Sequence, residues 1–383
     1  MSVFDRMGRT IAALGLTAAL LLSAAPVPAL ATITPPSISA PSALITTMDG
    51  TVLWSRAPMT RRAVASTIKM LNALVVRDSV NMTEVVTVAR KASDINNGDV
   101  HLLTGQKSTV RQLLEMMLVA SANDAAEAVA IHIAGTEKRY VALMNAKARE
   151  LGLTRTVAVD PHGLSERERS TAADLAVLAR TVMADPVLRS IVGKRSVAVV
   201  RPHRVTRVYK STNLLYGHYA GIEGVKTGYT STAGFCFVGA AKRGGVELLG
   251  VVLHTGSLAQ RFAQMRTLLS WGFAHCHMRL LVSADTTMGV VTVEGESPQS
   301  VTVHAARETS AALFDEGGPL VTTVTLPATV AGRVVRGQQL GTVDVSRHGV
   351  LLATVPLLAD SDTATETLTL TPRIVLTWAS LRD

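Results

Sequence analysis

Ser66 and Lys69 have the residue types and the spacing of a nucleophile and its base. They stand three residues apart in Ser66-Thr67-Ile68-Lys69, at the start of a segment that predicts a helix over 66–76. Residues i and i+3 of a helix share a face, so the amine can reach the hydroxyl. A serine needs an adjacent base, and a lysine acts as one only when burial or a second cation lowers its pKa. The pair alone would more often be two solvated residues on a helix.

Two later motifs supply further groups that peptide chemistry can use. Ser121 and Asn123 follow about 55 residues further on and offer a second hydroxyl and a carboxamide that can bind a peptide carbonyl. Lys226 offers a positive charge, Thr227 can hydrogen-bond a carboxylate, and Gly228 lets the backbone approach a ligand closely. Each motif alone would be a helix boundary or a turn at a strand edge. The three together, in this order, predict one catalytic site.

This set of motifs resembles the signature of the penicillin-recognising serine enzymes. Within that group the sequence is most similar to the D-alanyl-D-alanine carboxypeptidases, the low-molecular-mass penicillin-binding proteins. The resemblance covers about 43–280 and includes the segments 65–70, 121–126, 160–164, 224–230, 233–235 and 257–273. The β-rich segment after about 280 resembles the accessory domain of this family with much less sequence signal.

The resemblance implies a role for each catalytic group. Ser66 would attack the carbonyl of the penultimate D-Ala in a peptidoglycan stem peptide that ends in D-Ala-D-Ala, and Lys69 would take its proton. Ser121 and Lys226 would form the proton path to the leaving D-Ala. Asn123 would hold the peptide backbone. The same serine would bind β-lactam antibiotics covalently, and no cofactor is implied.

The resemblance also implies which residues bind the substrate. Thr227 would hold the terminal carboxylate, with Gly228 beside it, and the backbone N–H groups of Ser66 and Tyr229 would form the oxyanion hole. Arg261 stands where the family often places an arginine that helps to bind the carboxylate. The alternative for Arg261 is a solvated residue on a helix.

Other functions are weighed against this one. A class A β-lactamase would need a Glu-x-x-Leu-Asn loop, and the corresponding residues 165–170 contain Glu166 and Glu168 with no Leu-Asn after either. Ala122 also replaces the Asp of Ser-Asp-Asn. An endopeptidase that cuts cross-links would use the same residues, and the sequence does not separate it from a carboxypeptidase. A wall-binding scaffold without turnover is the non-enzymatic alternative.

The elements between the motifs predict an α+β fold. An Asp-Gly turn between β-type runs predicts a hairpin over 43–55, and a second hairpin is predicted over 235–253. Apolar spacing predicts helices over 66–76, 110–121, 124–134, 140–151, 171–183 and 258–275. We therefore expect an antiparallel sheet with helices and a helical insertion over about 80–190. The resemblance implies the penicillin-binding, β-lactamase-like transpeptidase fold.

Four segments are predicted along the chain. Residues 1–31 have the basic start, the apolar run and the small-residue end of a signal peptide, which predicts an exported, extracytoplasmic or periplasmic protein. Residues 32–280 would form the catalytic domain, and 281–370 a small all-β domain, a β-sandwich. Residues 371–383 fit either an amphipathic helix on the outer face of the cytoplasmic membrane or a final strand packed on the β domain, and both stay open.

Composition and charge limit the kinds of partner that the protein can bind. Apolar residues make up 48 % of the chain and charged residues 17 %, which excludes a disordered or fibrous protein. Residues 32–280 carry a net charge of +13 and residues 281–383 one of −5, so the catalytic part suits an anionic polymer. Aromatic residues make up only 4 %, and no stacking platform for a nucleic acid is visible.

Metal and redox chemistry have little support in the sequence. The two cysteines form no Cys-x-x-Cys pair, and a Cys236–Cys276 disulfide stays open because an exported protein could form it. His275 and His277 are two residues apart, which on a helix points them to different faces, and no acidic residue adjoins them in the sequence. We therefore expect no metal site.

Overall fold

The structure is a computed structural model that describes residues 33–95, 100–200, 206–284, 286–295, 299–315 and 318–363. The predicted signal peptide, 1–31, and the predicted tail, 371–383, lie outside these residues. Within the described residues, no helix has the length and apolarity needed to cross a membrane.

A five-stranded antiparallel sheet holds the catalytic part together. Its strand order is β2-β1-β9-β8-β7, and its strands are β1 (Ser42–Thr47), β2 (Val52–Arg56), β7 (Ile222–Thr230), β8 (Gly234–Arg243) and β9 (Val246–Thr255). Both predicted hairpins are present, and β1 pairs with β9. The sheet thus joins segments about 200 residues apart, as expected for an insertion between two terminal hairpins.

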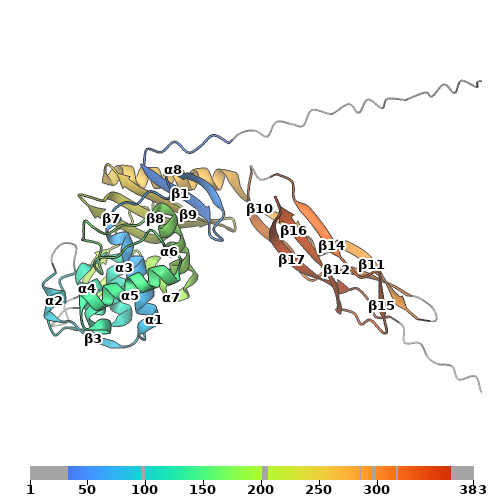
Figure 1. Cartoon of the computed structure of the whole chain (residues 1–383), viewed down its shortest axis with the longest axis horizontal. Coiled ribbons are helices and arrows are strands. Elements are labelled where there is room, and N and C mark those ends of the chain that lie inside the picture. Colours follow the sequence, from blue (N-terminus) through green and yellow to red (C-terminus); the bar gives the residue numbers. More distant parts are fainter. Residues whose placement is uncertain are drawn as a thin grey trace, which may run out of the picture. The chain divides into compact units, whose positions relative to one another are not determined.

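Helices cover both faces of this sheet (Figure 1). The long helix α8 (Leu258–His275) lies on one face and encloses an apolar cluster with β8 and β9. The other face meets the remaining helices, of which those after residue 80 form the predicted insertion. They are η1 (Ala65–Ile68), α1 (Lys69–Ser79), α2 (Arg90–Ser93), α3 (Val110–Val119), α4 (Asn123–Ala134), α5 (Glu137–Glu150), α6 (Ala172–Ala184) and α7 (Pro186–Val192). Because both faces are covered, the centres of β8 and β9 are buried on both sides.

The helix boundaries follow local capping signals. Thr171 precedes α6 and its side chain accepts a hydrogen bond from the Asp174 N–H at 3.0 Å, as an N-cap threonine does. Thr109 and Gln112 form a capping box at the start of α3. Two short strand pairs accompany the helices: β3 (Val85–Thr87) pairs with β4 (Lys107–Thr109) within the insertion, and β5 (Ser196–Val200) pairs with β6 (Thr206–Lys210) after it.

The segment after α8 contains strands only. They are β10 (Cys276–Val282), β11 (Thr287–Glu294), β12 (Gln299–Ala305), β13 (Thr309–Phe314), β14 (Val321–Thr325), β15 (Thr329–Ala331), β16 (Gln339–Arg347) and β17 (Val350–Ala359). Six of them form a sheet in the order β14-β16-β17-β12-β11-β15, and β10 pairs with β13. A valine-rich cluster forms their core. The fold is therefore α+β followed by a small all-β part; a domain boundary near 280 stays a prediction.

The two cysteines are both free and buried. Cys236 belongs to the apolar cluster between the sheet and the helices α1 to α7, and Cys276 belongs to the cluster between the sheet and α8. Each behaves as a small apolar residue, and burial raises the pKa of each thiol to about 11.

Candidate active site

Ser66 and Lys69 form the centre of the site. Ser66 lies in the 3-10 turn η1 and Lys69 begins α1, so the two side chains stack one turn apart. The Lys69 Nζ donates a hydrogen bond to the Ser66 Oγ at 2.9 Å. Lys69 is fully buried, whereas Ser66 keeps part of its surface exposed. The arrangement leaves the hydroxyl accessible and removes water from the amine beside it.

Two glycines allow other segments to approach the Ser66 turn. A Cβ on Gly163 would lie 2.3 Å from the Ala65 O, and a Cβ on Gly228 would lie 2.8 Å from the Val64 O. Gly163 also has a φ of +85°, which only glycine adopts without strain. Any larger residue at either position would displace the Ser66 turn, so both glycines fix the position of the nucleophile.

The Lys69 Nζ has two further partners besides Ser66. It donates to the Ser121 O at 2.9 Å and to the Asn123 Oδ1. Three acceptors match the three N–H groups of an ammonium, and a neutral amine could instead accept the Ser66 proton. Ser121 reaches this position because its backbone, between α3 and α4, has a φ of +64°.

Burial lowers the pKa of Lys69 to about 7. The acidic side chains of Asp160, Glu168 and Asp124 act in the opposite direction when they are ionised and raise it, but they do not cancel the burial. Lys69 is therefore neutral in a large fraction of molecules near pH 7, as a general base requires.

Lys226 faces Ser121 from the strand β7. Its Nζ donates to the Ser121 Oγ at 2.8 Å and to the Thr227 O at 3.0 Å. Burial lowers the pKa of Lys226 well below its ordinary value, and the positive charges of Lys69 and Arg261 add to the effect. Ser121 thus lies between the two lysines, with its carbonyl on one and its hydroxyl on the other.

The groups predicted to bind substrate line the same strand. Thr227 hydrogen-bonds the Thr212 Oγ1 at 2.7 Å, and the Arg261 Nη1 donates to the Gly228 O at 3.2 Å. Arg261 comes from α8 and is only 5 % exposed, so it is not a solvated helix residue. Burial lowers its pKa to about 10, which leaves it positively charged at neutral pH. Tyr229 is exposed at the end of this row.

His162 belongs to a loop that supports the nucleophile. The Ser66 Oγ donates to the His162 O at 3.3 Å. Asp160 holds this loop by accepting the backbone N–H groups of His162 and Ser165 at 2.9 and 2.6 Å. Although burial opposes it, hydrogen bonds from His162 and the loop backbone hold the pKa of Asp160 far below its usual range. The contact with the nucleophile is made by the His162 backbone.

Sequence reasoning missed the burial of Glu168. Its side chain has no exposed surface, and burial followed by the charge of Asp160 raises its pKa well above the ordinary value. Its neighbour Arg169 forms an antiparallel bridge with Val157. Nothing in the local pattern Glu-Arg-Glu-Arg distinguishes this glutamate from a solvated one; only the tertiary structure does.

The acidic residue that the sequence did not place near His275 and His277 is Asp315. Its Oδ2 lies 3.8 Å from the His275 Nδ1 and 3.5 Å from the His277 Nε2. Asp315 is about 40 residues away in the sequence, and it reaches the histidines because β13, which precedes it, pairs with β10. Within the described residues, no group of three or more His, Cys, Asp or Glu side chains is arranged to hold a metal ion.

Comparisons with known proteins match this geometry. A family described as D-alanyl-D-alanine carboxypeptidase matches residues 29–257. The D-alanyl-D-alanine carboxypeptidase DacB2 of Mycobacterium tuberculosis is 40 % identical over 236 residues, which cover 59 % of this chain and 79 % of that protein. A D-alanyl-D-alanine endopeptidase of Pseudomonas aeruginosa is 32 % identical over 265 residues, covering 67 % and 85 %.

Among solved structures, penicillin binding protein 5 from Haemophilus influenzae matches both the catalytic part and the β part. It is 25 % identical, with a TM-score of 0.65, and the match covers 86 % of this chain and 99 % of that one. The fold is therefore that of the penicillin-binding proteins, in agreement with the expectation from sequence.

Proposed function

Because this chain belongs to the D-alanyl-D-alanine carboxypeptidase family, we propose that Ser66 is the nucleophile with which it removes a terminal D-Ala. The protein is a serine peptidase, a hydrolase, and its substrates are peptidoglycan peptides. β-Lactams are expected to bind the same serine covalently. The assignment of roles to individual residues is our own and is supported by their geometry.

The first step forms an acyl-enzyme. Neutral Lys69 takes the proton of the Ser66 hydroxyl, with which it shares a 2.9 Å hydrogen bond. The Ser66 Oγ forms a bond to the carbonyl carbon of the penultimate D-Ala, and the carbonyl oxygen becomes negative. The backbone N–H groups of Ser66 and Tyr229 would stabilise this oxyanion, at about 3–4 kcal/mol for each donor.

The second step releases D-Ala and the third restores the enzyme. The C–N bond breaks, and the leaving amine takes a proton through Ser121, whose Oγ lies 2.8 Å from the Lys226 Nζ. Water then attacks the ester carbonyl, gives its proton to the same lysine–serine system, and Ser66 leaves with a proton. Asn123 would hold the peptide backbone throughout.

Recognition of the free carboxylate distinguishes a carboxypeptidase. Thr227 would hydrogen-bond the terminal carboxylate, Gly228 would let it approach β7 closely, and Arg261 would supply the positive charge. The support is that Arg261 is buried yet anchored to the Gly228 O at 3.2 Å, which places a cation against the strand that carries Thr227.

A second candidate activity is cleavage of cross-links between D-Ala and a diamino acid. The P. aeruginosa relative, named an endopeptidase, supports it. The same acyl-enzyme would serve, and only the leaving group differs. Product analysis on a pentapeptide and on a cross-linked dimer, with one enzyme preparation, decides between the two activities.

The observation that carries the assignment is the buried Lys69 amine on the Ser66 hydroxyl. Ser66→Ala should abolish both D-Ala release and covalent labelling by penicillin, while circular dichroism and the melting temperature stay close to wild type. A stable penicilloyl adduct on the variant would show that the nucleophile is another residue, and an unlabelled wild-type protein would favour a scaffold without turnover.

The remaining assignments concern location and domains. We propose that 1–31 directs export, so that the enzyme works outside the cytoplasm, and that 32–280 suffices for catalysis, since every residue named above lies before 280. A chain ending at 280 should then still label with penicillin. If the shortened chain gave no folded, labelled product, residues 281–370 would belong to the catalytic core.

Attachment of the tail 371–383 to a membrane is tested separately. If full-length and 1–370 proteins bind anionic vesicles equally, the tail is no anchor.

A further inference from the structure

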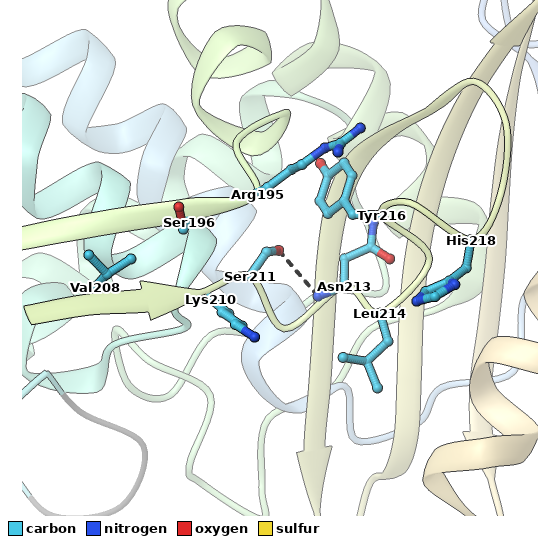
Figure 2. Close-up of a pocket in the computed structure, with 9 residues that line it drawn as sticks. All are labelled: Arg195, Ser196, Val208, Lys210, Ser211, Asn213, Leu214, Tyr216 and His218. Carbon is cyan, nitrogen blue, oxygen red and sulfur yellow. Dashed lines mark hydrogen bonds between the residues drawn. The ribbon is translucent and has the colours of Figure 1, made fainter.

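A groove beside the catalytic strand β7 has no role in the steps above. It is a hollow of about 710 Å³ between the β5–β6 pair and the segment that leads into β7. Figure 2 shows Arg195 on one side of Asn213, and Lys210 and Leu214 on the other. A second hollow of about 450 Å³ adjoins it, because Arg195 and His218 line both. Hollows of this size suit a ligand much larger than one alanine.

The groove has a fixed floor and exposed apolar side chains. Asn213 is buried, its Nδ2 donates to the Gly224 O at 3.2 Å, and its Oδ1 accepts the Leu215 N–H at 3.0 Å. Val208 and Leu214, which also line the groove, are 65 % and 52 % exposed. A rigid polar floor beside exposed apolar side chains is suited to a peptide that carries both methyl and polar groups.

The groove carries positive charge and no negative charge. Arg195 and Lys210 line it, and no Asp or Glu does. Glu223, at the start of β7, already pairs with Arg189 at 2.6 Å. Among the described residues, no carboxylate lies within ion-pair distance of Arg195 or Lys210. A concave surface with unneutralised cations attracts anions.

The segment that borders the groove contacts the groups that serve the leaving amine. The Thr212 N–H donates to the O of Val119, the last residue of α3, which precedes Ser121 by two residues. The Thr227 Oγ1 donates to the Thr212 Oγ1 at 2.7 Å. The next residue, Asn213, lines the groove. In the proposed mechanism Ser121 passes a proton to the leaving amine and Thr227 holds the leaving residue, so the groove adjoins the leaving side of the site.

Positions along β7 give the same direction. In the proposed mechanism the Tyr229 N–H holds the oxyanion of the scissile carbonyl, and Thr227 holds the carboxylate beyond the scissile bond. The groove residue Asn213 binds the O of Gly224, further along the strand in the same direction. A strand rises about 3.3 Å per residue, so Gly224 lies about 10 Å beyond Thr227. An extended peptide covers this distance in about three residues.

Only a cross-linked substrate has a leaving group long enough to use the groove. When D-Ala leaves, the substrate ends at the carboxylate on Thr227. When the leaving amine belongs to a diamino acid, the chain continues into a second stem peptide. This leaving strand carries alanine methyl groups and a terminal carboxylate of its own, which match the exposed apolar side chains and the cations of the groove.

We propose that this groove is a subsite for the leaving strand of a cross-linked dimer. Arg195 and Lys210 bind the carboxylate of the leaving strand, while Val208 and Leu214 contact its methyl groups. The proposal rests on the proposed acyl-enzyme function and deepens the second candidate activity, because it names the residues that recognise the leaving strand. It makes the two cations specificity residues for cross-linked substrates and gives them no part in the release of D-Ala.

The test compares a pentapeptide and a cross-linked dimer as substrates of one enzyme preparation. The double variant Arg195→Gln/Lys210→Gln should lower kcat/KM on the dimer roughly threefold to tenfold, through a higher KM. Its kinetics on the pentapeptide and its penicillin labelling should stay at the wild-type values, because D-Ala does not reach the groove. Added NaCl should raise the KM of the wild type for the dimer more than that of the double variant.

Two controls define the result. Arg207→Gln removes an exposed cation from β6, the strand of Lys210, but side chains alternate along a strand and Arg207 does not line the groove. It should leave both substrates unchanged. A dimer whose leaving strand carries amides in place of its carboxylates should show, with the wild type, the raised KM that the double variant shows on the acid.

The outcomes separate this proposal from the proposed function. An unchanged kcat/KM on the dimer in the double variant would overturn the subsite, as would an equal loss on both substrates. A wild type that releases D-Ala from the pentapeptide and leaves the dimer intact would overturn it too. If the wild type processed neither substrate, the proposed function itself would fail.

Discussion

The catalytic part and the β part bury different kinds of residue. Before residue 276 the structure buries a large set of ionisable groups, among them Lys69, Asp124, Glu168, Lys226 and Arg261. In the described residues after 276, Thr363 is the one buried polar side chain, and the core consists almost entirely of Val, Leu and Ala. Burying a charge is costly unless it is paired, and strongly shifted pKa values cluster at functional sites. The difference indicates that the chemistry belongs to the catalytic part.

The largest expected effect is at Lys69, where a substitution should lower the acylation rate without lowering the melting temperature. Lys69→Met removes the base and should slow penicillin acylation by about 10²–10⁴-fold. The same change removes a buried amine, so the melting temperature should hold or rise. In the wild type, acylation should increase with pH through about 7, because the base must be deprotonated and its pKa is about 7.

The effect of Lys69→Met on stability should depend on pH. The folded-state pKa of Lys69 lies below the unfolded value near 10.5. The unfolded chain therefore binds the proton more tightly, and the penalty on the folded state is complete below about pH 7 and absent above about pH 10.5. The gain from Lys69→Met should be larger at pH 6 than at pH 10. A variant that is less stable than wild type at both pH values would refute this account; Lys138→Met is the exposed control.

Arg261 should show the next largest effect. Arg261→Gln should weaken kcat/KM for a donor with a free terminal carboxylate by roughly tenfold or more relative to its amide, since a buried cation facing an anion is lost. Arg261→Lys keeps the charge and should recover part of the difference. Equal losses on the acid and the amide would mean that Arg261 only supports β7.

Glu168 should show a small but informative effect. Burial and the charge of Asp160 raise its pKa well above the ordinary value, which favours the protonated form. We therefore expect Glu168→Gln to replace a neutral group by a neutral one. The acid limb of the acylation profile should therefore move by less than about half a pH unit, whereas loss of an ionised neighbour of Lys69 would move it by about a unit or more. A limb shifted to clearly lower pH would show that Glu168 is ionised.

A substitution in the β part should have the smallest effect on activity. Val343→Ala truncates a fully buried side chain and should lower the free energy of unfolding of that part by about 1–3 kcal/mol. The acylation rate of the folded protein should stay at the wild-type value. If the acylation rate fell as well, the β part would contribute to catalysis, and the contrast between the two parts would not hold.

Local sequence signals were sufficient for most of the fold. The predicted helix 258–275 coincides with α8, and both hairpins were found because Asp-Gly and Gly-Gly turns act over a few residues. The strand β10 lies almost wholly before residue 281, where the all-β part was predicted to begin. β10 directly follows α8, and its pairing with β13 depends on residues about 30 positions further along the chain.

For the site, the sequence by itself determined the reactive groups: three motifs in a fixed order name Ser66, Lys69, Ser121, Asn123, Lys226 and Thr227. Only the tertiary structure decided their state. The burial that lowers the pKa of Lys69, the acidic side chains of Asp160 and Glu168 around it, and the anchoring of Arg261 on Gly228 all come from segments far apart in the chain. Residue type and spacing specify what a group can do, whereas its pKa depends on desolvation and nearby charge, which exist only after the chain has packed.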